Sequence, residues 1–512
     1  MKKNIGISPN QMLVINMTSN FLSLAVTFGI SFFLSPYIVK TVGVEAYGFV
    51  GLANNFISYA SLITIALNAL AGRFITIAIH EQNYEKANRY YSSVFLANCL
   101  ISVVLLLIGT IAWIYLEYLI SIPASILWDV KLLFAALFIN CIVSTVGSVF
   151  SVSTFATNKL YLASFRNIES SIIRAVVLVG LFALFSPKVS YLGITTLLTG
   201  VYCMAFNIHY MHKLLPELHI KRTSFDFAAV KELVSSGVWS LINRLGQILS
   251  DGLDLLVTNL FIDATAMGVL SLAKTVPSLI TTVVGSLVGV FSPNFIILYA
   301  EGRHNELQKA VKQAMKIMGV ITNLPVIILV VCGKQFFSLW QPTQDARQLQ
   351  ILSLLTIACI VISGGINCIY SVFAAVNKLK ANSLAVVSSG LVSVLVTFVL
   401  VKFTSLGIYA VAGVSTVVAI IRNLAFTAPY GAKCLNLKWY VLYPDIFRPL
   451  VFAIASIVIS VIVLMFIPSG GWIMLVIRAA ITGILSIAFG FFIVLNKSDR
   501  ALIISKFAKG KK

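Results

Sequence analysis

Long apolar runs, separated by short polar segments, make up most of this chain. A helix needs about 20 apolar residues to cross a bilayer, and some fourteen runs come near or above that length. The strands of a membrane barrel would alternate apolar and polar residues, which these runs do not do. The pattern therefore predicts an all-α polytopic membrane protein with about fourteen transmembrane helices. The predicted spans cover residues 11–39, 47–79, 91–118, 130–157, 168–185, 191–211, 237–261, 267–298, 315–339, 349–376, 383–403, 407–428, 449–467 and 472–495.

The composition and the placement of charge support this interpretation. Of the 512 residues, 59% are hydrophobic and 11% are charged, whereas about a quarter of the residues are charged in an ordinary soluble domain. A net charge of +20 would suggest a nucleic-acid partner in a soluble protein. Here, 26 of the 37 Lys and Arg residues fall in loops on one side of the predicted membrane. The positive-inside rule places these loops and both termini in the cytoplasm, so we expect no nucleic-acid partner.

The sequence also repeats itself at an offset of 214 to 223 residues. Residues 20–29 align with residues 243–252, and Asn158-Lys-Leu reappears as Asn377-Lys-Leu. Each copy holds six predicted spans. Because six is an even number, both copies share one orientation, and we expect an axis along the membrane normal to relate them, with a cleft between them. The predicted parts are an N-lobe (1–211), a cytoplasmic linker (212–236), a C-lobe (237–430), two further spans (431–496) and a basic cytoplasmic tail (497–512).

Motifs for enzyme chemistry are absent from the sequence. No Gly-rich loop ends in Lys-Ser or Lys-Thr, and His80-Glu81 lacks the second histidine of a zinc-binding helix. The seven cysteines show no CxxC spacing. We therefore expect no catalytic residue, no metal site and no cofactor.

Polar residues interrupt the seventh predicted span. At about 100° per residue, a group of five falls within an arc of roughly 80° and forms a polar stripe on an apolar helix. Its members are Arg244, Gln247, Asp251, Asp254 and Thr258. Asp251 would lie ~21 Å along the span, where a charge costs about 2.5 to 3.5 kcal/mol on insertion scales. We expect the stripe to face a cavity and Asp251, Asp254 and Gln247 to serve ion coupling. The alternative is a structural link between Arg244 and Asp251.

Five basic residues lie inside predicted spans, at Arg174, Arg244, Lys274, Arg422 and Arg478. Three of them, Arg174, Arg422 and Arg478, lie close enough to a span end for the side chain to reach water. Arg244 belongs to the polar stripe. Lys274 lies one turn before Pro277, where a broken helix exposes backbone carbonyls. All five are candidates for a cationic substrate-binding cleft.

The charges of the seventh and eighth spans are confined to the second copy of the repeat. Positions 244, 251, 254 and 274 correspond to Phe21, Phe28, Ser31 and Asn54 in the first copy. The first copy keeps neutral polar residues that are suited to hydrogen bonding a hydroxyl-rich ligand. The candidates for this polar lining are Asn20, Thr27 and Asn54. The alternative is that these small polar residues only pack one helix against another.

Several short motifs in the chain are similar to motifs of a known protein family. They include Gly43-Val-Glu-Ala-Tyr-Gly48, Ser250-Asp-Gly-Leu-Asp254, the segment from Met267 to Lys274, and Ser292-Pro293 followed by Glu301-Gly-Arg303. With two six-span lobes and two extra C-terminal spans, the chain resembles the multidrug/oligosaccharidyl-lipid/polysaccharide exporter superfamily. It is most similar to the polysaccharide-transporter branch that contains the O-antigen flippases.

This resemblance implies a flippase in the bacterial inner membrane. Its substrate would be an undecaprenyl-pyrophosphate-linked repeat unit of O-antigen or a similar polysaccharide, moved from the cytoplasmic to the periplasmic leaflet by alternating access. The lipid bilayer is an implied partner, as are a polysaccharide polymerase and its chain-length machinery. Two alternatives are a cation-coupled multidrug antiporter, which would favour an acidic cleft, and a membrane scaffold for polysaccharide assembly, which would need no cleft.

Overall fold

The computed structural model describes residues 9–494, and every regular element among them is helical. Thirteen helical segments in this part of the chain are long and apolar enough to cross a membrane. The all-α polytopic fold is therefore confirmed, and thirteen agrees with the prediction of about fourteen. The predicted seventh span, 237–261, is not among the thirteen, because the chain there forms a polar helix of 21 residues (Phe227–Gln247) and a separate helix of only 8 residues (Asp254–Phe261). The basic tail predicted for 497–512 lies outside the described residues.

The chain forms two compact units. Unit 1 runs to Ile248 and includes Asp263–Gly268, and unit 2 contains Leu249–Ile262 and the chain from Val269 onward. The helices of unit 1 are α1 (Pro9–Val42), α2 (Val44–His80), α3 (Tyr84–Ile114), α4 (Leu116–Leu119), α5 (Leu127–Gly147), α6 (Val152–Ala156), α7 (Leu160–Leu184), α8 (Ser190–Leu214) and α9 (Phe227–Gln247), with short 3₁₀ turns η1 (Ala124–Ile126), η2 (Ser148–Ser151) and η3 (Arg222–Ser224).

The chain from Ile248 onward has the same all-helical character. It contains the π-turn η4 (Ile248–Gly252), α10 (Asp254–Phe261), α11 (Ala264–Ala273), α12 (Thr275–Gly289), α13 (Ser292–Ala300), α14 (His304–Trp340), α15 (Ala346–Ile357), α16 (Ile360–Ala375), α17 (Leu379–Phe403), α18 (Ile408–Arg422), the π-turn η5 (Asn423–Thr427), α19 (Ala428–Cys434), α20 (Tyr443–Leu464) and α21 (Trp472–Ile493). Helix α14 packs against α15, α16, α20 and α21 in unit 2.

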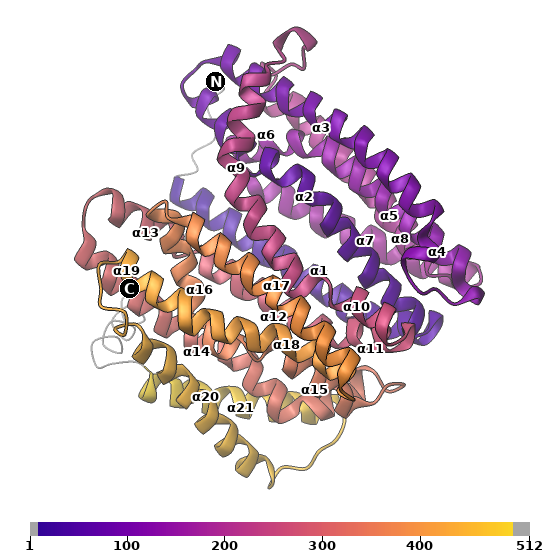
Figure 1. Cartoon of the computed structure of the whole chain (residues 1–512), viewed down its shortest axis with the longest axis vertical. Coiled ribbons are helices and arrows are strands. Elements are labelled where there is room, and N and C mark those ends of the chain that lie inside the picture. The colour runs from indigo at the N-terminus through magenta and orange to yellow at the C-terminus, as the bar shows by residue number, and fades with distance from the viewer. Residues whose placement is uncertain (1–8, 495–512) are drawn as a thin grey trace. The chain divides into compact units, whose positions relative to one another are not determined.

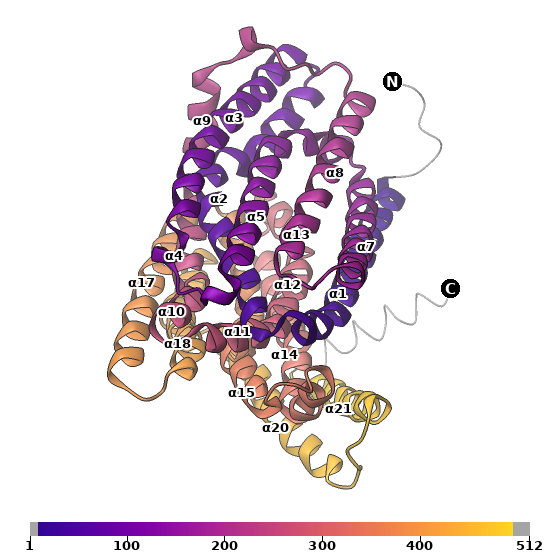
Figure 2. The same ribbon diagram turned by 90° about the vertical axis from the view of Figure 1, so that its right-hand side faces the viewer.

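Long helices pack side by side in unit 1. Helix α5 lies along α8, and α1 lies along α7 (Figure 2). Helix α2 packs against both α3 and α9 (Figure 1). The approach of α9 to α2 is close because Gly237 has no side chain. A Cβ at this position would lie 2.0 Å from the carbonyl oxygen of Ala66.

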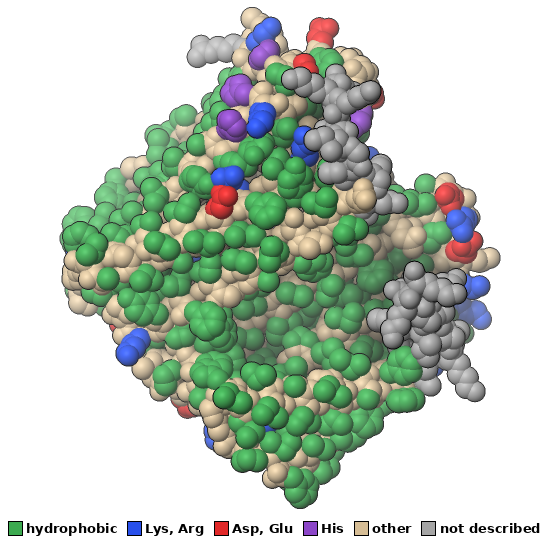
Figure 3. All heavy atoms as spheres, turned by 180° about the vertical axis from the view of Figure 1, so that it is seen from behind, with side chains coloured by type: hydrophobic (Ala, Val, Ile, Leu, Met, Phe, Trp, Pro, Cys, Tyr) green, Lys and Arg blue, Asp and Glu red, His purple; other side chains and the backbone are tan. Residues whose placement is uncertain are grey.

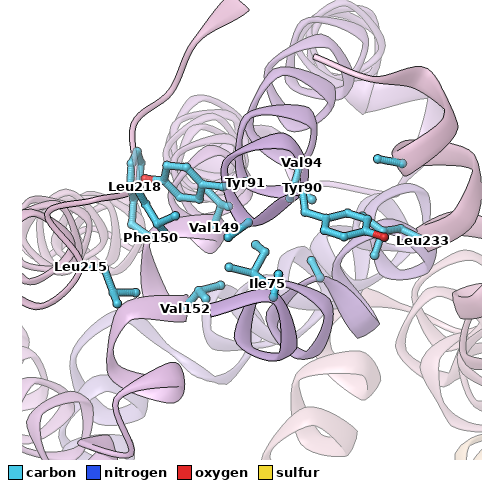
Figure 4. Close-up of a cluster of buried hydrophobic side chains, with 14 of the residues drawn as sticks. Ile75, Tyr90, Tyr91, Val94, Val149, Phe150, Val152, Leu215, Leu218 and Leu233 are labelled. Carbon is cyan, nitrogen blue, oxygen red and sulfur yellow. The ribbon is translucent and has the colours of Figure 1, made fainter. Parts of the chain in front are cut away.

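The segment that joins α8 to α9 packs against other helices of unit 1. Leu215 and Leu218 are buried in a hydrophobic cluster with residues of α2, α3 and α9, among them Ile75, Tyr91 and Leu233 (Figure 4). Asn88, Ser92 and Ser93 at the start of α3 bond to its backbone. Helix α9 begins at Phe227, ten residues before the predicted span, because Asp226 caps it through a 2.8 Å bond from the Ala228 amide.

Two turns that the sequence repeat brings into correspondence have the same local structure. Asn158 and Asn377 adopt left-handed conformations, with φ of 55° and 54°. In each turn the next residue donates its amide to a carbonyl five residues earlier, at distances of 2.8 and 2.9 Å. This is the Schellman arrangement, in which asparagine tolerates positive φ better than most residues. Each turn is followed by a helix of 25 residues, α7 or α17.

Hydrophobic side chains cover most of the face drawn in Figure 3, and the charged and histidine side chains lie toward its margins. A membrane-spanning chain is expected to have this distribution, because lipid favours apolar side chains and water at the two membrane surfaces favours charge.

Candidate functional site

The candidate site is a cluster of charged and polar side chains in unit 2, and Lys274 lies at its centre. This residue separates α11 from α12. Its ammonium Nζ lies 2.7 Å from Oδ2 of Asp254 and donates a 3.0 Å hydrogen bond to the backbone oxygen of Asp251. The Lys274 and Asp254 side chains are 18% and 10% exposed, so this ion pair is largely shielded from solvent.

The local sequence explains why the helix is interrupted at Lys274. Pro277 has no backbone N–H and cannot donate the usual helical bond to the carbonyl of Ala273. The hydroxyl of Ser353, on α15, donates to this carbonyl at 2.7 Å instead. The break that Pro277 predicts is therefore present, and a side chain from another helix satisfies the carbonyl that it leaves free.

Asp251 lies in the π-turn η4, between α9 and α10. Its side chain hydrogen-bonds that of Ser415 and lies near Lys274 and Arg422, yet the residue remains exposed. In a π-turn each backbone bond spans five residues, so the 100° spacing does not continue through it. The expectation of one continuous α-helix with a single polar stripe is therefore wrong. Gln247 is exposed before the turn, whereas Asp254 and Thr258 are buried after it.

Arg422 ends α18 and contributes the second cation of the cluster. Its guanidinium donates to Oγ of Ser389 at 3.1 Å and to the hydroxyl of Tyr370 at 3.4 Å. That hydroxyl in turn donates to Oδ1 of Asn423 at 3.0 Å. The second π-turn, η5, begins at Asn423. Such turns are frequent at functional sites, and here one precedes Asp254 while the other follows Arg422.

The formal charges of this cluster sum to zero. Asp251 and Asp254 carry two negative charges, and Lys274 and Arg422 carry two positive charges. An isolated charge is expensive in a membrane interior, and a neutral set of close partners reduces that cost. We call these four residues the charge quartet.

The structure leaves the other predicted cations of this part of the chain outside the quartet. Arg244 is exposed on α9, where it donates to Oε1 of Gln247 at 3.1 Å. Gln247 itself donates to Oδ1 of Asn243 at 2.9 Å. Arg478 lies on α21 near Cys332 of α14. Its buried Nε makes no hydrogen bond within the described chain.

The remaining predicted residues are dispersed over three helices of unit 1. Arg174 lies on α7 near Tyr47 of α2. Thr27 shares a 3.0 Å hydrogen bond with Ser171, which joins α1 to α7. Asn20 is exposed on α1. Asn54 is exposed on α2 and donates to the Val50 carbonyl of its own helix at 2.9 Å. Their assignment to a substrate site stays a prediction.

Sequence reasoning did not single out Ser389, Ser415, Tyr370 or Asn423. A signal was present for Tyr370 and Asn423, because both are polar residues inside apolar runs. The serines gave none, since hydroxyls are plentiful in the spans and most such groups bond their own backbone.

Comparisons with known proteins agree with this architecture. The family model described as "Polysaccharide biosynthesis protein" matches residues 13–299. The uncharacterized membrane protein EpsK of Bacillus subtilis (strain 168) is 27% identical over 497 residues, which cover 97% of this chain and 98% of that protein.

Solved structures show a similar fold at low sequence identity. The lipid II flippase MurJ, in an inward closed conformation, matches with a TM-score of 0.69 and 14% identity over 94% of this chain and 98% of MurJ. An inward-facing multidrug resistance MATE family transporter of the MOP superfamily matches with a TM-score of 0.61 and 13% identity, over 83% of this chain and 98% of that one.

The helical spans and these structural likenesses show that the chain shares its fold with MurJ and with the MATE transporter, as the resemblance in the sequence predicts. The chain belongs to the polysaccharide biosynthesis protein family, whose model covers more than half of its length.

Proposed function

We propose that this protein is a flippase for lipid-linked polysaccharide repeat units. Its substrate is an undecaprenyl-pyrophosphate-linked repeat unit of O-antigen or a similar glycan, which it moves from the cytoplasmic to the periplasmic leaflet of a bacterial inner membrane. Both termini are cytoplasmic, and the polymerase and chain-length machinery use the product. The family of polysaccharide biosynthesis proteins supports the substrate class, and the fold shared with a lipid II flippase supports the reaction.

The charge quartet is the observation that carries this proposal. A pyrophosphate with its sugar cannot cross ~30 Å of hydrocarbon unaided. Lys274 and Arg422 supply two cations beside exposed Asp251, and ammonium and guanidinium groups bind phosphate oxygens through charge-assisted bonds. The lipid tail stays in the bilayer while the protein alternates between inward-open and outward-open states.

Export of polysaccharide by substituted proteins tests the proposal. We expect Lys274→Ala to lower export by about tenfold or more and Lys274→Arg to preserve part of it, because the second keeps the charge. Arg244→Ala tests the other predicted binding residue. Lys402→Ala is the matched control, since Lys402 lies over the rings of Phe398 and Phe403 at the end of α17. Normal export by both Lys274→Ala and Arg244→Ala would remove the pyrophosphate-binding role.

A cation-coupled multidrug antiporter is the second candidate, because the MATE transporter shares the fold. The two functions differ in what a strain lacking the protein accumulates. A flippase deficiency leaves lipid-linked repeat units on the cytoplasmic face, whereas an antiporter deficiency leaves the repeat units unaffected and raises drug sensitivity.

A membrane scaffold for polysaccharide assembly would differ from both, because it would tolerate neutralisation of all four residues of the charge quartet.

A further inference from the structure

The Lys274 ammonium already forms an ion pair with Asp254, so an anionic substrate must bind a cation that has a carboxylate partner. The ammonium has three N–H donors, and the structure shows two of them bonded, one to Asp254 and one to the Asp251 carbonyl. The Lys274 side chain is the more exposed partner of the pair. The Lys274 side chain is therefore the partner that is more open to an incoming phosphate.

The charge balance of the quartet favours competition between Asp254 and the phosphate. The four residues are already neutral, so a pyrophosphate added to the intact set brings its negative charge beside two carboxylates. Like charges at close range in a membrane interior repel strongly. The phosphate and the Asp254 carboxylate therefore compete for the Lys274 ammonium.

The surroundings of the two cations of the quartet differ. Asp254 begins α10, one residue after the π-turn η4, and Lys274 donates both to its carboxylate and to the Asp251 carbonyl in that turn. Arg422 differs from Lys274, because its guanidinium donates to the neutral hydroxyls of Ser389 and Tyr370. Of the two cations, Lys274 alone has a carboxylate oxygen within ion-pair distance among the described residues.

We propose that Asp254 is an intramolecular competitor that holds Lys274 until the pyrophosphate of the substrate displaces it, so that the Asp254 carboxylate sets the affinity and the release of the substrate. This inference rests on the proposed function, because it assumes a pyrophosphate-bearing substrate. Re-formation of the Lys274–Asp254 pair after translocation expels the phosphate and returns the protein to its empty state.

The test uses the full chain reconstituted in nanodiscs, with undecaprenyl pyrophosphate as the probe. We expect Asp254→Asn to bind the probe about tenfold more tightly than the natural protein, because the competing charge is gone. Asp254→Glu keeps the competitor and should bind within about threefold of the natural protein. Asp345→Asn is the matched control: the exposed Asp345 caps α15, and asparagine preserves the cap.

A double substitution separates competition from a structural role. Lys274→Met should weaken binding, and Asp254→Asn should give no gain in the Lys274→Met background, because competition acts only through Lys274. If Asp254→Asn does not fold, Asp254→Ser provides the same comparison. Equal or weaker binding by the neutral variants, with normal binding by the natural protein, overturns the competitor role and makes Asp254 a positioning residue. Absence of binding by the natural protein overturns the proposed function itself, and the competitor role with it.

Discussion

At the scale of single residues, the bond from Ser353 to the Ala273 carbonyl maintains the helix break at Lys274. Ser353 is fully buried, so its replacement leaves that carbonyl without a donor. We expect Ser353→Ala to reduce stability by about 1 to 3 kcal/mol, the usual cost of a buried unsatisfied polar group. Thermal unfolding of the purified protein in detergent measures this loss.

Pro277→Ala provides the internal control for that experiment. Alanine restores an N–H that can donate to the Ala273 carbonyl, so Ser353→Ala should cost much less in the Pro277→Ala background. The same loss in both backgrounds would show that Ser353 acts by filling space.

The sequence predicted the residue types of the site better than their pairing. A charged side chain inside an apolar span is unusual because a charge in the membrane interior costs free energy. This identifies Asp251, Asp254, Lys274 and Arg422 as candidates. The sequence does not reveal that Lys274 pairs with Asp254, which lies 20 residues away, beyond the break between α10 and α11. Long side chains on neighbouring helices have several possible partners, and only the packing of the backbone selects one.

At the scale of whole elements, the distance between α2 and α9 depends on Gly237. A methyl group at this position would meet the Ala66 carbonyl at 2.0 Å, and backbone atoms cannot move aside as a flexible side chain can. We expect Gly237→Ala to destabilise the protein by about 1 to 3 kcal/mol and to lower its Tm.

Gly285→Ala is the matched control in this case. Gly285 lies inside α12, and no heavy atom of a neighbouring residue lies within 4 Å of the place that a Cβ would occupy, so alanine should be neutral or should stabilise the helix by up to ~1 kcal/mol. Equal effects of the two substitutions would mean that helix propensity, rather than the contact with Ala66, determines the result.

The sequence predicted the helices well wherever the apolar runs were long, because a span must be helical for its backbone groups to form hydrogen bonds in lipid. The prediction was least accurate from residue 212 to residue 261. There, Asp226 starts α9 early, Leu215 and Leu218 dock the linker, and η4 interrupts the seventh span. A π-turn has no dependable sequence signature, since it adds one residue to a turn without needing a glycine or proline.

At the scale of the whole molecule, the proposed export of repeat units needs an energy source. The sequence has no Gly-rich loop that ends in Lys-Ser or Lys-Thr, and we propose that an ion gradient or consumption of the product drives export. Asp251 is the exposed carboxylate of the quartet, and we propose that it senses the gradient. Asp251→Asn keeps the size of the side chain but fixes its charge at zero.

We expect reconstituted Asp251→Asn protein to lose most of the dependence of transport on the proton or sodium gradient. Transport measured in liposomes with and without each gradient, and with membrane potential alone, distinguishes the three sources. If transport by this variant depends on pH and on the ion gradients as in the wild type, Asp251 has no coupling role. The proposal of a lipid-linked substrate would not be affected by that result.

The turns at Asn158 and Asn377 allow corresponding positions of the two copies of the repeat to be compared within one chain. Both turns have an asparagine where the backbone adopts positive φ, so the local geometry accounts for that residue in each copy of the repeat. The positions of Lys274 and Asp254 differ in this respect. Their counterparts in the first copy are Asn54 and Ser31, so the repeated pattern of the sequence does not require the charged pair. Comparison of corresponding positions within one molecule thus separates residues that the local geometry calls for from residues that only one copy contains.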